Sequence, residues 1–333
     1  MGQTLSEPET AKDTACCQNS EYRVGSSCMQ GWRINMEDSH THILSLPDDP
    51  GTAFFAVYDG HGGAKIAEYA GKNLHKLITK RCEYKDGDVV KAMEMAFLEI
   101  DDIMLIEESL KNEQAGSTAV TMIIKDNTVF CANVGDSRAI ASVNGKVQPL
   151  SFDHKPTNEK EYNRITAAGG WVEYNRVNGN LALSRALGDF TFKRNEKKKP
   201  EDQIVTAFPD VEVHKINENW EFIVLACDGI WDVMKNEEVV AFVRENLAAG
   251  VEPEDICENL MMKCLAPDCQ MAGLGCDNMT VVIVGLMHGK TFEELSARCA
   301  VPAEVEENED TNCIDQVNES EENTSEDEDL QNK

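Results

Sequence analysis

Three apolar stretches of the chain meet an aspartate at one end. AFFAVYD reaches Asp59, FIVLACD reaches Asp228, and MTVVIVGL begins just after Asp277. Runs of this length and composition are typical of buried β-strands. A single aspartate at the end of a strand is usually a turn former. Several at the ends of separate strands predict a fold that brings their carboxylates together at one rim.

Carboxylates that converge at one rim repel each other unless cations lie between them. Ligands that are all oxygen favour Mg²⁺ or Mn²⁺ over Zn²⁺. Gly60 follows Asp59 and can bring its backbone carbonyl close to an ion, and His61 is a candidate proton donor. Arg33 lies four residues before Glu37 and can bind a phosphate through two parallel hydrogen bonds. The spacing therefore predicts a site for metal ions and phosphate.

The remaining periodicity indicates a mixture of helices and adjacent strands. Apolar residues at three- and four-residue spacing predict helices over about 64–78 and 86–108, and two more around 239–247 and 256–264. VFCANVGD runs into Asp136, where Gly-Asp-Ser indicates a hairpin turn before RAIASV. Because strands outnumber the helices between them, a doubly wound parallel sheet is not favoured.

Three motifs that carry chemistry in other proteins lack their context here. Cys17 and Arg23 have the spacing of cysteine-dependent phosphatases, but no glycine lies between them. Asp86-Gly-Asp88 lacks the buried strand that an aspartyl-phosphate site needs, so we expect these residues to cap the next helix. The cysteines show no paired Cys-x2-Cys spacing, which argues against zinc, and all twelve are interpreted as reduced thiols.

Eight motifs in family order make the chain similar to the metal-dependent protein phosphatases, the type 2C Ser/Thr phosphatases. They are QGWRINMED (30–38), VYDGHGG (57–63), AGSTA (115–119), NVGDSR (133–138), DHKP (153–156), RVNGNLALSRALGD (176–189), LACDGIWD (225–232) and GCDNMT (275–280). Together they cover roughly 22–288, and we place the catalytic domain at 22–290.

The resemblance implies an α+β fold, a four-layer α-β-β-α sandwich of two antiparallel sheets flanked by helices. It also implies a variable flap within 151–200 beside a cleft. Two Mg²⁺ or Mn²⁺ ions would bind there, with a weaker third. The resemblance assigns the metal ligands as follows: Asp59 bridges the ions, Glu37 and the Gly60 carbonyl bind one ion, Asp228 and Asp277 bind the other, and Asp136 binds the third. It assigns Asp38 to orient a metal-bound water. It places Arg33 and Arg185 on the substrate side and makes His61 the general acid.

The activity so implied is hydrolysis of phosphoserine and phosphothreonine in proteins by a hydroxide that bridges the metals. No phospho-enzyme forms, so no nucleophilic Cys or Ser is expected. Two other interpretations stay open. One is a non-catalytic relative that binds phosphoproteins; the intact carboxylate set argues against it. The other is a hydrolase of small phosphate esters, which the resemblance of the flap and open cleft disfavours.

The ends of the chain differ from its middle. Residues 1–21 are expected to be a flexible lead-in, and MGQTLS fits N-myristoylation of Gly2, which would support only weak membrane association. Residues 291–302 are expected to be a short connecting segment. Residues 303–333 hold thirteen acidic residues and one Lys, and we expect a disordered acidic tail.

Charge and hydropathy limit the partners. The net charge of −29 argues against nucleic acid, because phosphates are bound by Lys and Arg. No apolar run approaches the length of a membrane-spanning helix, and the N-terminus lacks a secretory signal. We therefore expect a monomer in the cytoplasm, with the nucleus and the membrane surface as further locations.

Overall fold

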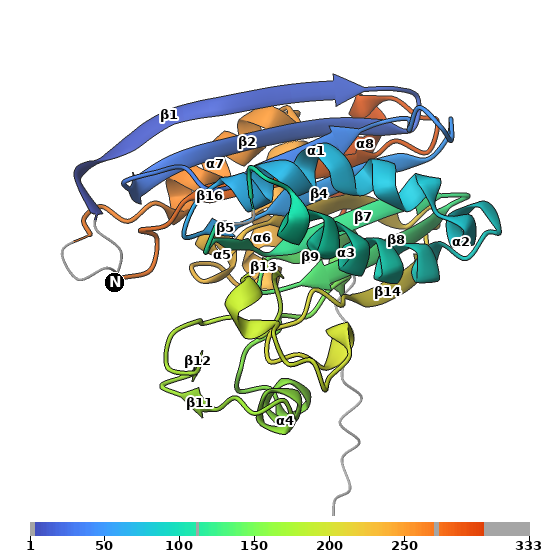
Figure 1. The fold of residues 1–333 in the computed structure, drawn as a ribbon. Helices are drawn as coiled ribbons and strands as arrows, with labels where there is room; N and C mark the ends of the chain where they lie inside the picture. Colours follow the sequence, from blue (N-terminus) through green and yellow to red (C-terminus); the bar gives the residue numbers. More distant parts are fainter. Residues whose placement is uncertain (1–3, 111–112, 270–272, 303–333) are drawn as a thin grey trace, which may run out of the picture. The chain divides into compact units, whose positions relative to one another are not determined.

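The computed structural model describes residues 4–110, 113–269 and 273–302. Their centre is a pair of antiparallel sheets (Figure 1). In spatial order, the six-stranded sheet contains β1 (Thr4–Gln18), β2 (Tyr22–Arg33), β16 (Met279–Leu286), β15 (Trp220–Ala226), β9 (Arg138–Val143) and β10 (Lys146–Pro149). The five-stranded sheet contains β14 (Asp210–Lys215), β8 (Thr128–Val134), β7 (Ala119–Lys125), β4 (Ala53–Tyr58) and β3 (Ser39–Ile43).

The central strands are buried on both faces, which explains why they are apolar at every position. Phe54 packs against helices on the outer side of β4, whereas Phe55 packs between the two sheets. In β15, Val224 packs against the outer helices and Ile223 packs between the two sheets. Because successive side chains of a strand point to opposite faces, a strand covered on both sides needs an unbroken apolar run.

Helices form the two outer layers. The five-stranded sheet is covered by α1 (Lys65–Lys80), α2 (Cys82–Lys85) and α3 (Val89–Ile106). The six-stranded sheet is covered by α5 (Asp228–Trp231), α6 (Asn236–Ala248), α7 (Pro253–Cys264) and α8 (Phe292–Ala300). The predicted four-layer α-β-β-α sandwich is confirmed. Asp88 caps α3 by accepting a hydrogen bond from the Lys91 backbone N–H at 3.0 Å, as expected.

The remaining elements are short. The flap contains α4 (Glu159–Ala167) and the hairpin of β11 (Val172–Glu173) and β12 (Arg176–Val177), which lie below the sandwich in Figure 1. A small sheet joins β5 (Gly60–His61), β6 (Gly116–Ser117) and β13 (Leu187–Gly188). Two 3₁₀ turns follow, at Phe190–Phe192 and Pro200–Asp202. None of the helices in the described ranges has the length and apolar character to cross a bilayer.

The expectation of a flexible lead-in over residues 1–21 is wrong for Thr4–Gln18, which form the edge strand β1. This strand is polar and is held mainly by backbone pairing with β2. The Thr14 hydroxyl also lies 2.8 Å from that of Ser27 and donates to Glu258 Oε1 of α7 at 2.7 Å. Composition gives no signal for such a strand, because an edge strand needs little apolar burial. Cys17 lies within β1 opposite Val24, so no phosphate-binding loop forms there.

The expectation of a connecting segment over 291–302 is also wrong, because most of it forms α8. Thr291 and Glu294 form a reciprocal capping box at its start. Leu295 and Cys299 bury against the six-stranded sheet and its helices. The Thr-x-x-Glu spacing before apolar residues was a readable helix start. Gly2 and the predicted acidic tail 303–333 lie outside the described residues.

Candidate active site

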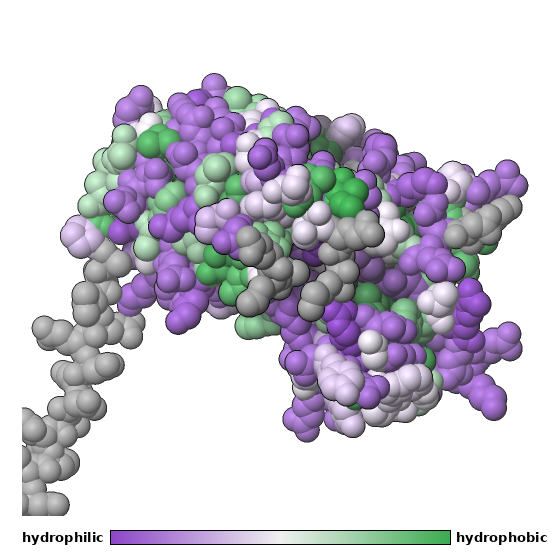
Figure 2. Space-filling model, turned by 90° about the vertical axis from the view of Figure 1, so that its left-hand side faces the viewer, coloured by the Kyte–Doolittle hydropathy of each residue, from purple (hydrophilic) through white to green (hydrophobic). Residues whose placement is uncertain are grey.

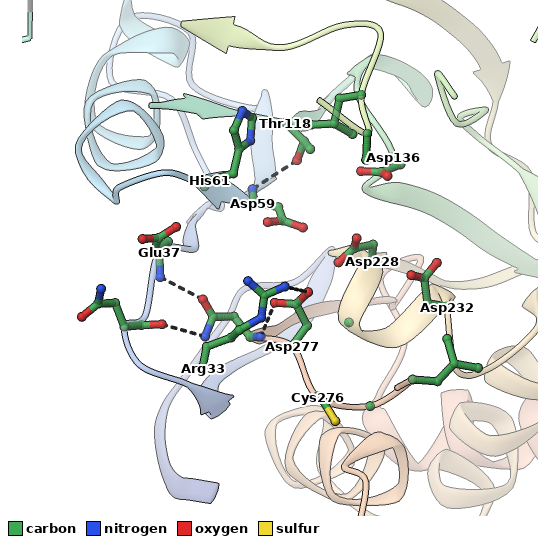
Figure 3. Close-up of a pocket in the computed structure, with 18 of the residues that line it drawn as sticks. Arg33, Glu37, Asp59, His61, Thr118, Asp136, Asp228, Asp232, Cys276 and Asp277 are labelled. Carbon is green, nitrogen blue, oxygen red and sulfur yellow. Dashed lines mark hydrogen bonds and ion pairs between the residues drawn. The ribbon is translucent and has the colours of Figure 1, made fainter. Parts of the chain in front are cut away.

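A cleft of about 1100 Å³ opens at one end of the sandwich, where loops from both sheets meet. Asp59 follows β4 and Asp136 follows β8 of one sheet, whereas Asp228 follows β15 and Asp277 precedes β16 of the other. Glu37 joins them from the segment after β2 (Figure 3). The sandwich therefore places these five acids, distant in sequence, around one space.

Burial and neighbouring acids make three of these carboxylates costly in their charged form. Burial, followed by the neighbouring Asp228, raises the pKa of Asp59 well above its usual value. Burial, followed by Asp136, does the same to the pKa of Asp228. Burial also raises the pKa of Asp136, although Lys155 opposes the change. Positive charge between these carboxylates would stabilise their ionised form.

Asp38, which follows the cleft residue Glu37, keeps one side-chain oxygen without a partner among the described residues. Its Oδ2 accepts a hydrogen bond from the Thr280 hydroxyl at 2.7 Å. Its Oδ1 is buried and has no hydrogen-bond partner among the described residues. Burial raises the pKa of Asp38 to about 7, even though the Thr280 hydrogen bond lowers it. A buried carboxylate oxygen without a partner fits a position for a bound water.

Two basic side chains form ion pairs with acids of the cleft. Arg33 forms an ion pair with Asp277, and Lys155 forms one with Asp136. Within the described ranges, no three Asp, Glu, His or Cys side chains converge as a ready-made ligand set. The donor chemistry nevertheless fits a divalent cation, because the described residues that line the cleft offer several carboxylate oxygens and no thiolate.

Gly60 and Asn278 fix the backbone around the acids. A Cβ atom at Gly60 would lie 2.2 Å from the Glu37 carbonyl oxygen, so only glycine allows β5 to approach that segment. Asn278 accepts a hydrogen bond from the Glu37 backbone N–H at 3.0 Å and donates to the carbonyls of Gln30 and Asn35. These contacts bind the Glu37 segment to the Asp277 loop.

His61 lies at the cleft and contacts Asp189. The distance from His61 Nε2 to Asp189 Oδ2 is 2.7 Å. Burial lowers the pKa of His61, but the hydrogen bond and charge of Asp189 outweigh it, and the pKa rises above its usual value. A Cβ atom at Gly116 would lie 2.2 Å from Asp189 Oδ2, so glycine leaves room for the pair. The cleft thus presents an imidazole whose protonated form is stabilised.

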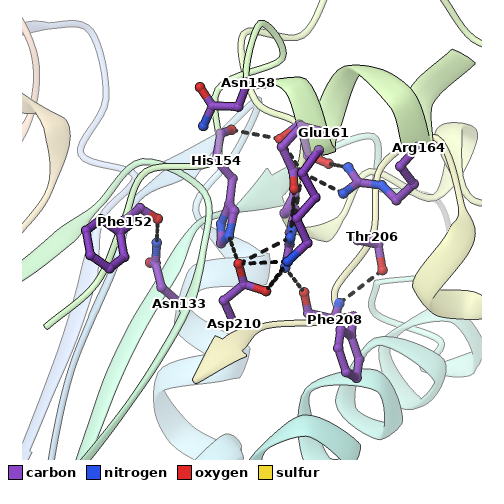
Figure 4. A network of polar contacts seen from close by, with 12 residues as sticks. Asn133, Phe152, His154, Asn158, Glu161, Arg164, Thr206, Phe208 and Asp210 are labelled. Carbon is purple, nitrogen blue, oxygen red and sulfur yellow. Dashed lines mark hydrogen bonds and ion pairs between the residues drawn. The ribbon is translucent and has the colours of Figure 1, made fainter. Parts of the chain in front are cut away.

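The substrate-side position predicted for Arg185 is wrong in this structure. Arg185 is 2% exposed and does not line the cleft. Its guanidinium donates to Glu161 Oε1 at 2.7 Å and to Asp210 Oδ1 at 2.9 Å. Figure 4 shows Glu161 and Asp210 in one network with His154 and Arg164. Arg185 therefore links α4 of the flap to β14 of the sandwich.

The interpretation of all cysteines as reduced thiols is wrong for one pair. Cys269 and Cys276 form a disulfide, and Cys276 directly precedes Asp277. Both sulfurs lie in a small cluster with Trp32, the neighbour of Arg33. Their separation of seven residues differs from the Cys-x2-Cys spacing that we examined in the sequence, and spacing alone does not show that two cysteines meet.

Several cleft residues carried no role in the sequence analysis. Lys155 and Asp232 line the cleft, and Asp189 contacts His61 of the cleft; all three lie within the motifs quoted above. Thr118 accepts a hydrogen bond from the Asp59 backbone N–H at 3.1 Å and contacts the Ser137 hydroxyl at 2.6 Å. The motifs could have identified these positions, but only the fold gives the partners.

A helix-covered antiparallel sandwich with an acidic, oxygen-donor cleft at its end is the arrangement expected of the metal-dependent phosphatases that the sequence resembles. The family model "Protein phosphatase 2C" matches residues 22–273, and the chain belongs to that family. It is a Ser/Thr protein phosphatase, and the family is metal-dependent.

Individual relatives and a solved structure support this family assignment. A probable protein phosphatase 2C from Caenorhabditis elegans is 62% identical over 91% of this chain and 85% of its own length. Protein phosphatase 2C homolog 2 from Hypocrea jecorina is 50% identical over 88% of this chain and 69% of its own. The crystal structure of a Toxoplasma gondii phosphatase superposes with a TM-score of 0.70 at 26% identity, covering 83% of this chain and 96% of that one.

Proposed function

We propose that the chain hydrolyses phosphoserine and phosphothreonine in proteins with two Mg²⁺ or Mn²⁺ ions, and with a weaker third. The observation that carries this proposal is the ring of carboxylates around the cleft, in which burial and neighbouring acids raise the pKa values of Asp59 and Asp228. When bound, the ions would neutralise the phosphate dianion and lower the pKa of a water positioned to attack phosphorus.

The chain's own residues would hold the ions and the reacting groups. Asp59, which faces Asp228 and Asp277 across the cleft in Figure 3, would be a ligand of both ions. The other ligands would be Glu37 and the Gly60 carbonyl at one ion, Asp228 and Asp277 at the other, and Asp136 at the third. The free Oδ1 of Asp38 would accept a hydrogen bond from the attacking water.

Arg33 and His61 would act on the substrate. The Arg33 side chain is 43% exposed at the cleft, and its ion pair with Asp277 would be replaced by metal on one side and phosphate on the other. Its guanidinium would then stabilise charge on the phosphate oxygens. His61, held by Asp189, would protonate the serine or threonine oxygen as it leaves, a contribution of about 10²–10⁴-fold.

The test is release of phosphate from a phosphothreonine peptide with Mn²⁺ or Mg²⁺, followed by excess EDTA and then by restored metal. We expect activity to vanish with EDTA and to return with metal. An acid quench during turnover should trap no phosphorylated protein. Turnover that persists in EDTA, or a trapped phospho-enzyme, would overturn the mechanism.

We also propose that the protein acts as a monomer in the cytoplasm or nucleus on phosphoprotein substrates, with weak membrane association if Gly2 is myristoylated. The MGQTLS sequence supports acylation. Mass spectrometry of the native N-terminus tests it, and an unmodified Gly2 would remove the basis for membrane association. Light scattering tests the oligomeric state.

A further inference from the structure

Two large aromatic side chains are exposed on the flap hairpin. Trp171, just before β11, is 54% exposed, and Tyr174, in the turn between β11 and β12, is 85% exposed. Figure 2 shows pale atoms of intermediate hydropathy on the lower part of the molecule, beneath a hollow in this face. Exposed aromatics on one short hairpin, three residues apart in the sequence, are characteristic of interaction surfaces.

The backbone at the tip of the flap hairpin, where Tyr174 lies, adopts a strained conformation. The φ angles of Tyr174 and Asn175 are 50° and 60°, the left-handed conformation of a two-residue hairpin turn. Glycine, asparagine or aspartate is favoured there, so a tyrosine at this position strains the backbone. The Tyr174 side chain has no hydrogen bond or ring contact with the described residues that would offset this cost. Strain of this kind concentrates at functional sites.

The hairpin is nevertheless firmly held. Val177 is buried against Ile165 and Val205 of the flap. The Trp171 backbone N–H donates to Asn178 Oδ1 at 3.0 Å, and the Trp171 carbonyl accepts from the Asn178 backbone at 2.8 Å. The two aromatic side chains are thus presented on a fixed frame, so little conformational entropy is lost when a ligand binds.

The outward face of the hairpin leads into the cleft. Glu173 and Arg176 are paired across the strands, and Arg176 lines the cleft. Side chains alternate along a strand, so Trp171 shares the face of Glu173, about 7 Å farther along. Leu181, another cleft residue, pairs through its backbone with Val177. The face that carries Trp171, Glu173 and Arg176 is therefore continuous with the wall of the cleft, and Tyr174 follows Glu173 at the tip of the hairpin.

We propose that Trp171 and Tyr174 dock an apolar side chain of the phosphoprotein substrate, a few residues from its phosphorylated Ser or Thr. The inference rests on the proposed function and names a specificity determinant for it. The cleft, at about 1100 Å³, is larger than a phosphorylated side chain requires, and Ile34 and Leu274 add exposed apolar groups at its rim. A substrate segment leaving the cleft along the Arg176 face would reach the two aromatics.

The experiment compares phosphothreonine peptides in which a single Leu is moved one position at a time through Ser- and Gly-containing flanks. For the wild-type protein, kcat/KM should rise about 5- to 20-fold with Leu at one favoured position. Trp171→Ala and Tyr174→Ala should each abolish most of this preference by raising KM with kcat nearly unchanged, because docking contributes equally to the ground and transition states.

Two controls separate docking from catalysis and from folding. Tyr162→Ala removes another exposed tyrosine of the flap, 47% exposed on α4, and should retain the preference. Turnover of p-nitrophenyl phosphate, which has no flanking residues, should stay within about twofold in both docking variants. A wild-type protein without positional preference, or docking variants that keep it, would overturn the inference, as would an equal loss on p-nitrophenyl phosphate.

The proposed function can fail independently. If no metal supports turnover of p-nitrophenyl phosphate, the proposed mechanism fails, and docking is then read from fluorescence anisotropy of the labelled peptides. Weaker binding of the Leu peptide to Trp171→Ala and Tyr174→Ala, with Tyr162→Ala unchanged, would still support the docking surface. Equal binding by all four proteins would overturn it.

Discussion

At the scale of single residues, Asp59 and Asp228 show the conflict between binding metal and folding. Both carboxylates are half-buried beside other acids, and this environment raises their pKa values. We predict that Asp59→Asn and Asp228→Asn each lower the metal-dependent kcat at least roughly 10²-fold, because the amide is a poor ligand for the ions that stabilise the transition state. In EDTA, neither substitution should lower the melting temperature, since each removes a repulsive charge.

The measurements are Mn²⁺-dependent turnover of a phosphothreonine peptide and thermal unfolding in EDTA. Asp102→Asn, on the exposed side of α3, is the matched control and should leave both unchanged. Full activity in Asp59→Asn or Asp228→Asn would contradict the metal assignment.

The individual acids could be predicted from the sequence, but their basic and polar partners could not. Asp59, Asp228 and Asp277 stand at the ends of recognisable strands, so their convergence follows from a sheet with a common rim. The Arg33–Asp277 pair joins residues 244 positions apart, and the His61–Asp189 pair joins residues 128 apart. Such pairs depend on the order of strands in the sheets, which periodicity does not show.

At the scale of elements, the network around Glu161 attaches the flap to the sandwich. Burial raises the pKa of Glu161, but hydrogen bonds and charge from Arg185 outweigh it and lower the pKa to about 2, from 4.5. A carboxylate whose folded pKa is depressed stabilises the fold above its unfolded pKa and loses that contribution as pH falls. We predict that the free energy of unfolding falls between pH of about 4.5 and 2, and that Glu161→Gln shows a shallower fall.

Urea unfolding at several pH values across this window, with the flap followed by hydrogen exchange, tests the prediction. Glu159→Gln changes an exposed acid of the same helix and should keep the wild-type slope. A Glu161→Gln protein with the same acid dependence as the wild type would show that the network does not couple the flap to pH.

The loop before β16 is a second element whose role can be measured. The Cys269–Cys276 disulfide closes it immediately before Asp277, so it restricts where that carboxylate can lie. We predict that Cys276→Ser, or treatment with a non-chelating phosphine reductant, raises the Mn²⁺ concentration needed for half-maximal activity several-fold. The protein should also lose roughly 2 kcal/mol of stability.

The exposed free thiol Cys82 provides the control, and Cys82→Ser should behave as the wild type in both measurements. Unchanged Mn²⁺ activation in Cys276→Ser would mean that the rest of the Asp277 loop, including Asn278, fixes the carboxylate without the disulfide.

Helices and strands were predictable where apolar residues recur at a regular spacing in the sequence. The helices over 65–80 and 89–106 follow such a period closely, as do the buried central strands. Strand β1 was missed because its stability comes from backbone pairing at a sheet edge, which leaves no apolar pattern. Helix α8 was missed although its capping box is readable, because the segment is short and its burial depends on α6 and β15.

At the scale of the whole molecule, the negative charge of the protein repels a negatively charged substrate. The net charge is −29, and residues 303–333 supply −12 of it, which leaves −17 for the rest. A phosphate dianion therefore approaches a negative protein, and this repulsion weakens as salt shortens the screening length to about 10 Å at 0.1 M.

We predict that, at low salt, a phosphopeptide with Arg flanks has a higher kcat/KM than one with Glu flanks, and that the ratio shrinks toward one as salt rises. For a chain ending at Pro302, this ratio should depend less steeply on salt, because its net charge is −17 instead of −29. The measurement is kcat/KM for both peptides across a salt series at constant free Mn²⁺, with melting temperatures as the folding control. Identical salt slopes for the full and shortened chains would mean that the acidic residues after 302 exert no field at the cleft, and that the carboxylates around the metal site alone set the electrostatic preference.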